Sequence, residues 1–139
     1  MITENKQKHI FNVARLMKEN APKIGLDAEE MFTLGYLHDI GYEFDSENHH
    51  LTGAKIMEGQ GYKYVKEILY HGFPDAEYHS LELDLLNWCD MQVDSKGNVV
   101  SFDERLADIK SRRGEDSKIY QNCVKLINYL KEVLGDKLN

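Results

Sequence analysis

The sequence predicts an all-α fold, a single bundle of about six to seven helices. Apolar residues recur three and four positions apart along most of the chain, which is the period of an amphipathic helix. Glycine and proline interrupt this periodicity at short intervals, and the longest run with strand-like alternation is only 97–102. At 139 residues the chain is long enough for one hydrophobic core, so we expect one domain over residues 1–139.

Four helices are expected in the N-terminal half, separated by glycine, proline or polar residues. Asp27 and Glu30 form a plausible capping box at the start of the second helix, and Gly41 is a natural residue to end it. The apolar residues of each helix recur at the spacing of one buried face. The expected ranges are 6–20, 27–40, 49–58 and 64–69.

Three further helices are expected in the C-terminal half. The first of them is the most apolar segment of the chain and contains Trp88. Ser101 and Glu104 form a capping box for the next helix. The last has clean 3.6-residue periodicity and is expected to end at Gly135. The expected ranges are 79–93, 101–113 and 119–135.

Charge and composition narrow the classes of partner. A formal net charge of −7 argues against a nucleic-acid polymer, because phosphate backbones select basic surfaces. It leaves small phosphorylated ligands open, since a bound divalent cation reverses the local electrostatics. No apolar run approaches the roughly 20 residues of a membrane span, and the N-terminus lacks the apolar stretch of a signal peptide, so we expect a cytoplasmic protein with no membrane contact. Cys89 and Cys123 form no CxxC pair and are expected to be reduced core residues.

Histidine and aspartate residues occur at inward positions of separate expected helices. Neutral imidazoles combined with carboxylates form mixed nitrogen and oxygen sites that suit divalent transition metals. Asp90, inside the most apolar helix, is costly to bury unless a cation or hydrogen-bond donors compensate it. A single histidine on an apolar face is more often a hydrogen-bonded core residue, but that interpretation weakens when several such residues coincide. The candidate ligands are His9, His38, Asp39, His49, His71 and Asp90.

Two pairs of neighbouring residues need separate treatment, because adjacent side chains on a helix diverge by about 100°. His38 and Asp39 can share one metal only if the end of the helix redirects the aspartate. Of His49 and His50, one is expected to face solvent. We assign His50, like His79, to a surface or capping position.

The order of the candidate ligands resembles a known family. The HDIG motif at 38–41, with His9 before it and Asp90 after it, is similar to the H…HD…D pattern of HD-domain metal-dependent phosphohydrolases. Subfamilies with a second metal also have an HxxxGA segment, which 49–54 matches, and a later histidine, matched by His71.

The resemblance covers about residues 6–94, which precede C-terminal helices over about 101–136. Small relatives of this kind include the dinucleoside tetraphosphate hydrolases, which share all six positions. One departure is Tyr42, which stands where many members have a lysine thought to bind phosphate.

The resemblance implies hydrolysis of a phosphoester or phosphoanhydride in a small phosphorylated molecule, with a nucleotide as the favoured class. His9, His38, Asp39 and Asp90 would hold one ion, and Asp39 would bridge to a second ion held by His49 and His71. Asp39, His49 and His71 would also be the catalytic residues, and the ions would be Fe, Mn, Co, Ni or Zn, with Mg also compatible. A homodimer is left open.

Three basic residues are weaker candidates for phosphate contacts, because Arg and Lys bind phosphate but more often lie solvated on helix surfaces. They are Lys55, Arg105 and Arg112. Two other functions are open: a module that senses metal and nucleotide without turnover, and, ranked last, a di-iron oxygenase, since the same scaffold hosts that chemistry.

Overall fold

The computed structural model describes residues 2–45 and 47–138, and within them the chain forms seven α-helices and two short 3₁₀ helices. Val93 and Val99 form an isolated bridge, and the described residues contain no strand. The all-α prediction is therefore confirmed. The elements are α1 Glu4–Asn20, η1 Ala21–Ile24, α2 Ala28–Leu37, η2 Ile40–Glu43, α3 His49–Gly59, α4 Val65–Tyr70, α5 Leu81–Asp90, α6 Phe102–Arg113 and α7 Lys118–Leu138.

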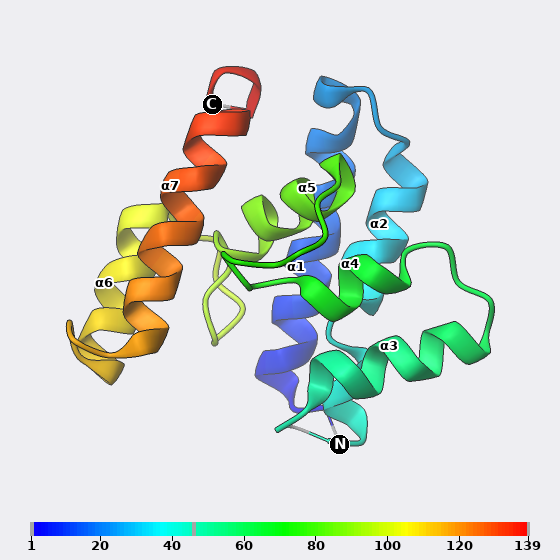
Figure 1. The fold of residues 1–139 in the computed structure, drawn as a ribbon, viewed down its shortest axis with the longest axis horizontal. Coiled ribbons are helices and arrows are strands. Elements are labelled where there is room, and N and C mark those ends of the chain that lie inside the picture. The colour runs from blue at the N-terminus through cyan, green and yellow to red at the C-terminus, as the bar shows by residue number, and fades with distance from the viewer. Residues whose placement is uncertain (1, 46, 139) are drawn as a thin grey trace.

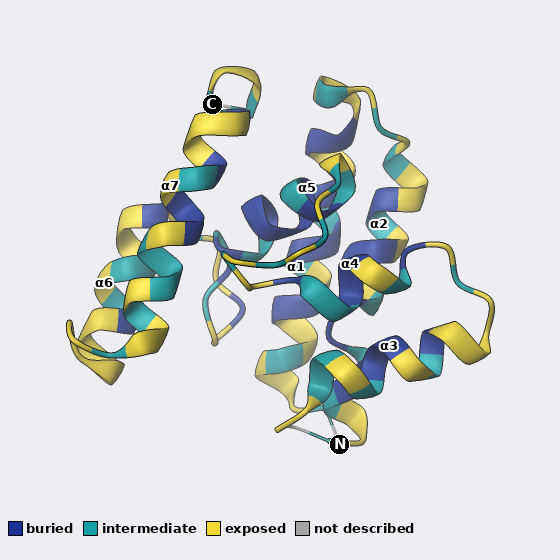
Figure 2. Ribbon diagram, viewed as in Figure 1, coloured by how far each residue is buried: buried dark blue, intermediate teal, exposed yellow. Residues whose placement is uncertain are grey.

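The helices surround a core that lies along α1 and α5 (Figure 1). α6 and α7 pack together on one side, and α3 and α4 lie on the other, with α2 against α1. The faces turned toward this centre are buried, whereas α6 and the outer face of α7 are largely exposed (Figure 2). Fully buried apolar side chains come from helices distant in sequence, among them Met17, Leu34, Leu86 and Leu130. None of the described helices is both long and apolar enough to cross a membrane.

Gly35 sets the close packing of α2 on α1. A Cβ atom at Gly35 would lie 2.7 Å from the Cα of Ala14, which is closer than carbon atoms approach in folded proteins. A side chain here would push the helices apart. Glycine therefore allows the end of α2, with His38, to lie beside His9 on α1.

The HDIG segment departs from the predicted helix. α2 ends at Leu37, and Asp39 has φ −108° and ψ 20°, outside the helical region, so the aspartate is redirected as a shared site requires. Gly41 lies in η2 and does not cap α2 in the left-handed conformation. Its role is a close approach: a Cβ at Gly41 would lie 1.9 Å from the carbonyl oxygen of His49, so only glycine lets α3 begin against this segment.

Other helix ends differ in part from the expectations. The capping box of Ser101 and Glu104 opens α6 as predicted. At α2 only half of the predicted box forms: the side chain of Asp27 caps the helix, whereas the carboxylate of Glu30 accepts hydrogen bonds from Lys63 and Tyr64. α5 begins at Leu81, because the hydroxyl of Ser80 caps it by accepting a hydrogen bond from the N–H of Leu83. The prediction that α7 ends at Gly135 is wrong, since the helix continues to Leu138.

Candidate metal centre

Four of the six candidate ligands converge from three helices. His9 lies on α1, His38 caps α2 with Asp39 beside it, and Asp90 is the last residue of α5. One ligand atom from each side chain lies within 4.8 Å of every other. His9, His38 and Asp39 are buried and Asp90 is nearly so. The sequence therefore placed these four residues correctly as neighbours, although they are up to 81 positions apart.

The two carboxylates face the imidazole nitrogens of His9 and His38. The Oδ1 atom of Asp90 lies 2.8 Å from Nε2 of His9 and 3.3 Å from Nε2 of His38. The Oδ2 atom of Asp39 lies 3.6 Å and 3.2 Å from the same two nitrogens. Two nitrogen atoms and two oxygen atoms therefore face one another across a small space. This set of ligands suits a divalent transition metal.

Backbone carbonyls orient three of the imidazoles. Nδ1 of His38 lies 2.6 Å from a carbonyl oxygen in the last turn of α2, and Nδ1 of His71 lies 2.7 Å from one in α4. Nδ1 of His9 lies 3.2 Å from the carbonyl oxygen of Asp94. A carbonyl oxygen can only accept, so each Nδ1 carries the hydrogen, and a neutral ring then presents a lone pair on Nε2. Metal-binding histidines are commonly held by this kind of contact.

A second cluster adjoins the first through Asp39. The Oδ1 atom of Asp39 lies 3.2 Å from Nε2 of His71 and 3.7 Å from Nε2 of His49, whereas its Oδ2 atom faces the first cluster. His49 begins α3, and His71 follows the end of α4, where the N–H of Gly72 donates to the side chain of Asn87 on α5. Asp39 therefore has the placement that a carboxylate needs to bridge two ions.

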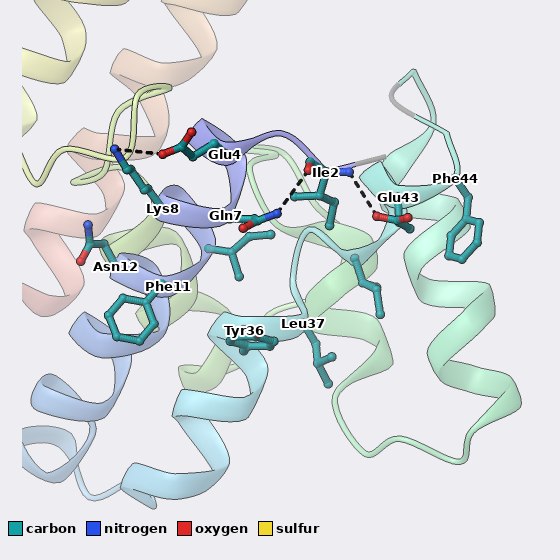
Figure 3. A pocket seen from close by; sticks show the side chains of 12 residues that line it. Ile2, Glu4, Gln7, Lys8, Phe11, Asn12, Tyr36, Leu37, Glu43 and Phe44 are labelled. Carbon is teal, nitrogen blue, oxygen red and sulfur yellow. Dashed lines mark hydrogen bonds and ion pairs between the residues drawn. The ribbon is translucent and has the colours of Figure 1, made fainter.

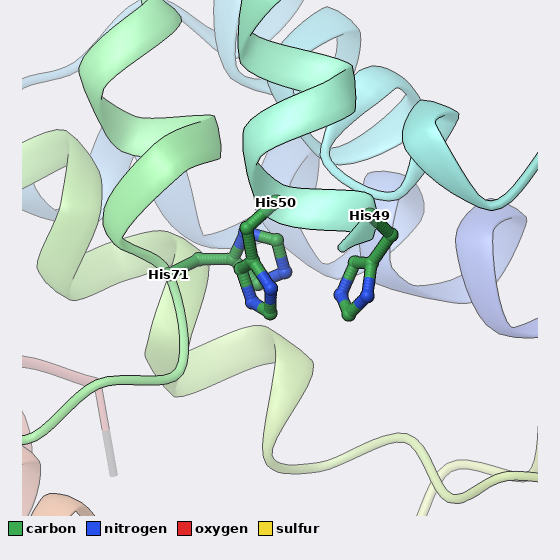
Figure 4. Close-up of side chains that lie close together, drawn as sticks. All are labelled: His49, His50 and His71. Carbon is green, nitrogen blue, oxygen red and sulfur yellow. The ribbon is translucent and has the colours of Figure 1, made fainter. Parts of the chain in front are cut away.

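His50 is part of this second cluster, so its assignment to the surface is wrong. The rings of His49, His50 and His71 converge (Figure 4), with centroids 3.9 Å apart for the first pair and 4.2 Å for His50 and His71. The three rings offer nitrogen atoms within 4.8 Å of one another. Both adjacent histidines reach the site because α3 starts there, between η2 on one side and the end of α4 on the other. His79, by contrast, is exposed as predicted.

Charge interactions favour ionised carboxylates at the centre. Burial opposes the charged form of both aspartates, but the imidazole of His38 and its neighbours outweigh burial and hold the pKa of Asp39 and of Asp90 well below the usual range. Burial likewise opposes the imidazolium of His38, yet the charges of Asp39 and Asp90 raise its pKa to about 10, so without a metal this ring is protonated, and a bound cation would take the place of its Nε2 proton. Burial, with the neighbouring histidines, lowers the pKa of His50 to about 3, so this ring is neutral at physiological pH.

The residues present fit a divalent metal. Nε2 of His38 is fully buried and makes no hydrogen bond within the described residues, although two carboxylate oxygens lie within 3.3 Å of it. A buried polar atom without a hydrogen bond is rare and calls for an explanation. A cation bound between the imidazoles and carboxylates would satisfy this nitrogen and compensate the two buried negative charges.

The two clusters open into a cavity of about 370 Å³ whose far wall comes from α6 and the start of α7. Four basic residues line it: Lys6, Arg105, Arg112 and Arg113. The Nε and Nη1 atoms of Arg105 are buried there without a hydrogen-bond partner among the described residues. Arg112 forms an ion pair with Asp108, 3.0 Å away. The cavity therefore combines a metal-binding floor with a cationic rim.

Lys55 does not join this rim. It is exposed on α3 and does not line the cavity. Six positions separate it from His49, which places its side chain about 240° around the helix axis from that ligand. The expectation that Lys55 contacts phosphate at this site is therefore not supported. Cys89 is buried as predicted, whereas Cys123 is only half-buried and lines the cavity; both are free thiols.

Lys6 is a further residue at the site that the sequence pattern did not predict. Its Nζ atom lies 3.3 Å from Oδ2 of Asp39 and 4.0 Å from the centroid of the Tyr42 ring. The available signal was its position three residues before His9, because residues three apart on a helix share a face.

A second and larger groove lies elsewhere on the surface, between α1, α2 and η2 (Figure 3). It measures about 760 Å³, and most of its wall is apolar, with Phe11, Tyr36 and Phe44 all at least half exposed. Neither group of potential metal ligands in the described residues lines it. The potential metal ligands are therefore found at the smaller cavity.

In a comparison with known families, the family model described as HD domain matches residues 7–132. This range includes all six candidate ligands and the C-terminal helices α6 and most of α7. No curated protein and no solved structure matches the chain.

Proposed function

Because the chain belongs to the HD domain family, whose members are mostly metal-dependent hydrolases, we propose that it is a metal-dependent phosphohydrolase. The proposed reaction is hydrolysis of a phosphoester or phosphoanhydride bond in a small phosphorylated molecule, with a nucleotide as the favoured class. One observation carries the proposal: three imidazoles, oriented through Nδ1, direct Nε2 at two ionised carboxylates at the floor of a cationic cavity.

The metal-binding residues would divide between two ions. His9, His38, Asp39 and Asp90 would hold the first, and Asp39 would bridge to a second held by His49 and His71. His50, whose ring is neutral, adds a third imidazole to this second set. Nitrogen and oxygen ligands of this kind suit Mn, Fe, Co, Ni or Zn, and Mg remains compatible with the oxygen atoms.

Bound divalent cations would polarise a phosphoryl oxygen and lower the pKa of a water molecule that attacks phosphorus. The protein residues would supply position and charge. Asp39, between the clusters, would orient the water, and Arg105, with nitrogen atoms free for an anion, would bind phosphate oxygens. If a single ion binds, His49 and His71 would be placed to protonate the leaving oxygen.

The walls of the cavity support a substrate with both phosphate and a flat apolar group. Basic residues approach from α1 and α6, while Phe73 and Ile119 present exposed apolar surface at the same cavity. Aromatic and apolar side chains stack against nucleobases without selecting one of them. A dinucleoside polyphosphate belongs to this class and is one substrate to test, given the resemblance to that branch of the family.

The test is a screen of phosphatase, phosphodiesterase and pyrophosphohydrolase activity across nucleotides with Mn, Co, Ni and Mg. We expect at least one nucleotide to be hydrolysed in a metal-dependent way, and His38→Ala and Asp90→Ala to lose both bound metal and turnover. His79→Ala is the matched control, because this histidine is exposed and outside the cavity.

Two other results would replace the proposal. Stoichiometric metal and nucleotide binding without turnover of any substrate would favour a sensor module. Oxygen consumption by the iron-loaded protein, with no phosphate release, would favour an oxygenase.

A further inference from the structure

Lys6 links the metal-binding floor of the cavity to its cationic rim. Its side chain, 24% exposed, projects from the first turn of α1, and its Nζ atom donates a hydrogen bond to Oδ2 of Asp39 over 3.3 Å. Among the described residues, it is the only lysine or arginine whose ion pair reaches a candidate metal ligand. Its charge therefore lies where metal and substrate would meet.

The contact with Asp39 sets Lys6 in competition with a metal ion. Oδ2 of Asp39 is the same oxygen that faces His9 and His38, so a cation held by those imidazoles would use it too. An ammonium group has three donors and no lone pair, so it cannot itself be a ligand. Because a metal ion and the ammonium of Lys6 would share one oxygen and repel each other, metal binding at the first cluster would weaken the ion pair of Lys6.

Tyr42 holds the ammonium of Lys6 at the cavity through a second contact. The Nζ atom of Lys6 lies 4.0 Å from the centroid of the Tyr42 ring, a cation–π distance. Tyr42 is itself held by stacking on His49, with ring centroids 3.9 Å apart. Both side chains line the cavity, so an ammonium that leaves Asp39 still faces the space above the metal centre.

We propose that Lys6 is a phosphate-binding residue, transferred from Asp39 to a substrate phosphate when metal binds, with the Tyr42 ring as its support. This proposal rests on the proposed function, since it assumes a phosphorylated ligand at the metal centre. Lys6 supplies this contact rather than Arg112, because Arg112 is exposed and already paired with Asp108. An ammonium close to the metal ligands would bind the same phosphoryl group that the metal polarises.

The experiment compares two equilibrium affinities in Lys6→Met, which keeps the length of the side chain and removes its charge. Calorimetric titration of the chelated protein with Mn²⁺ gives metal affinity, and titration of the Mn²⁺-loaded protein with inorganic phosphate gives anion affinity. We expect metal affinity to rise by about threefold or more and phosphate affinity to fall by about tenfold or more, because one charge-assisted contact is lost. Lys8→Met, on the exposed side of α1, should change neither.

Tyr42 provides a second test through its ring. Tyr42→Phe keeps the ring and should retain phosphate affinity, whereas Tyr42→Leu should lower it. Lys6→Arg keeps the charge and should also retain phosphate affinity. This variant keeps the proposal testable if Lys6→Met does not fold. Unchanged phosphate affinity in Lys6→Met, or metal affinity that falls instead of rising, would overturn the proposal. Neither titration requires turnover, so both shifts can be measured even if no substrate is hydrolysed.

Discussion

Asp39→Asn is the sharpest test of a shared carboxylate between the two clusters. Both oxygens of Asp39 are engaged: Oδ2 faces His38 at 3.2 Å, and Oδ1 faces His71 at 3.2 Å. Asparagine has nearly the same shape but offers one acceptor oxygen and one NH₂ group. In either orientation of the amide, one cluster therefore keeps an oxygen while the other meets donor hydrogens, and the negative charge is lost from both.

The size of the effect follows from that loss. Removing one electrostatic contribution at a reacting centre costs about 10²-fold or more in turnover, which corresponds to roughly 2.7 kcal/mol in the activation barrier. We expect this fall in hydrolysis together with a reduced metal content, because at least one ion loses a ligand. Folding should survive, since the volume is unchanged and the repulsion between Asp39 and Asp90 is relieved.

The assay combines elemental analysis, steady-state kinetics and circular dichroism on Asp39→Asn beside the wild type. Asp136→Asn is the matched control, the same chemical change at an exposed position on α7. Wild-type turnover and metal content in a folded Asp39→Asn protein would refute the shared-carboxylate reasoning, and a sensing role would then describe the site better.

Three further predictions follow from the surroundings of the site. Gly41→Ala should destabilise the protein by several kcal/mol in urea unfolding, because the new Cβ would meet a backbone carbonyl at 1.9 Å, whereas Gly59→Ala, with open space around it, should be tolerated. In the chelated protein, the free energy of unfolding should fall as the pH rises from about 6.5 toward 10. The folded-state pKa of His38 is raised to about 10, so the stabilisation from its charge is complete below pH 6.5 and is lost as the pH rises toward 10. His38→Ala should remove this dependence on pH. His50→Ala should lower affinity for the second ion by about tenfold in metal titrations, as expected for a lost neighbouring ligand, and His79→Ala should not; equal affinities would remove His50 from the site.

The fold was predictable because the signals for these helices are local. Helical periodicity, the caps at Asp27 and Ser101 and the punctuating glycines each act within a few residues. That His9, His38 and Asp90 lie close together was predictable for a different reason. Histidines and carboxylates buried on separate helices need polar or charged partners, and they can serve as partners for one another.

What escaped prediction depends on how helices meet. His50 reaches the second cluster because the end of α4 lies beside the first turn of α3. The apolar periodicity within α3 cannot predict that contact between two helices. Lys6 becomes a site residue through Asp39, 33 positions away. Gly41 was expected to end a helix, but its role is a close backbone approach to α3, a constraint that exists only in three dimensions.

The floor and the far wall of the cavity come from different parts of the chain. The metal-binding floor comes from α1 to α5, whereas Arg105, Arg112 and Ile109 reach the cavity from α6, a separate helix that supplies no metal ligand among the described residues. Mutations along the inner face of α6 would therefore change the phosphate-binding and apolar wall of the cavity while leaving the candidate metal ligands in place. Selection could then change what the cavity binds without changing its metal ligands, provided that Phe102 and Ile109, which α6 buries in the core, are kept.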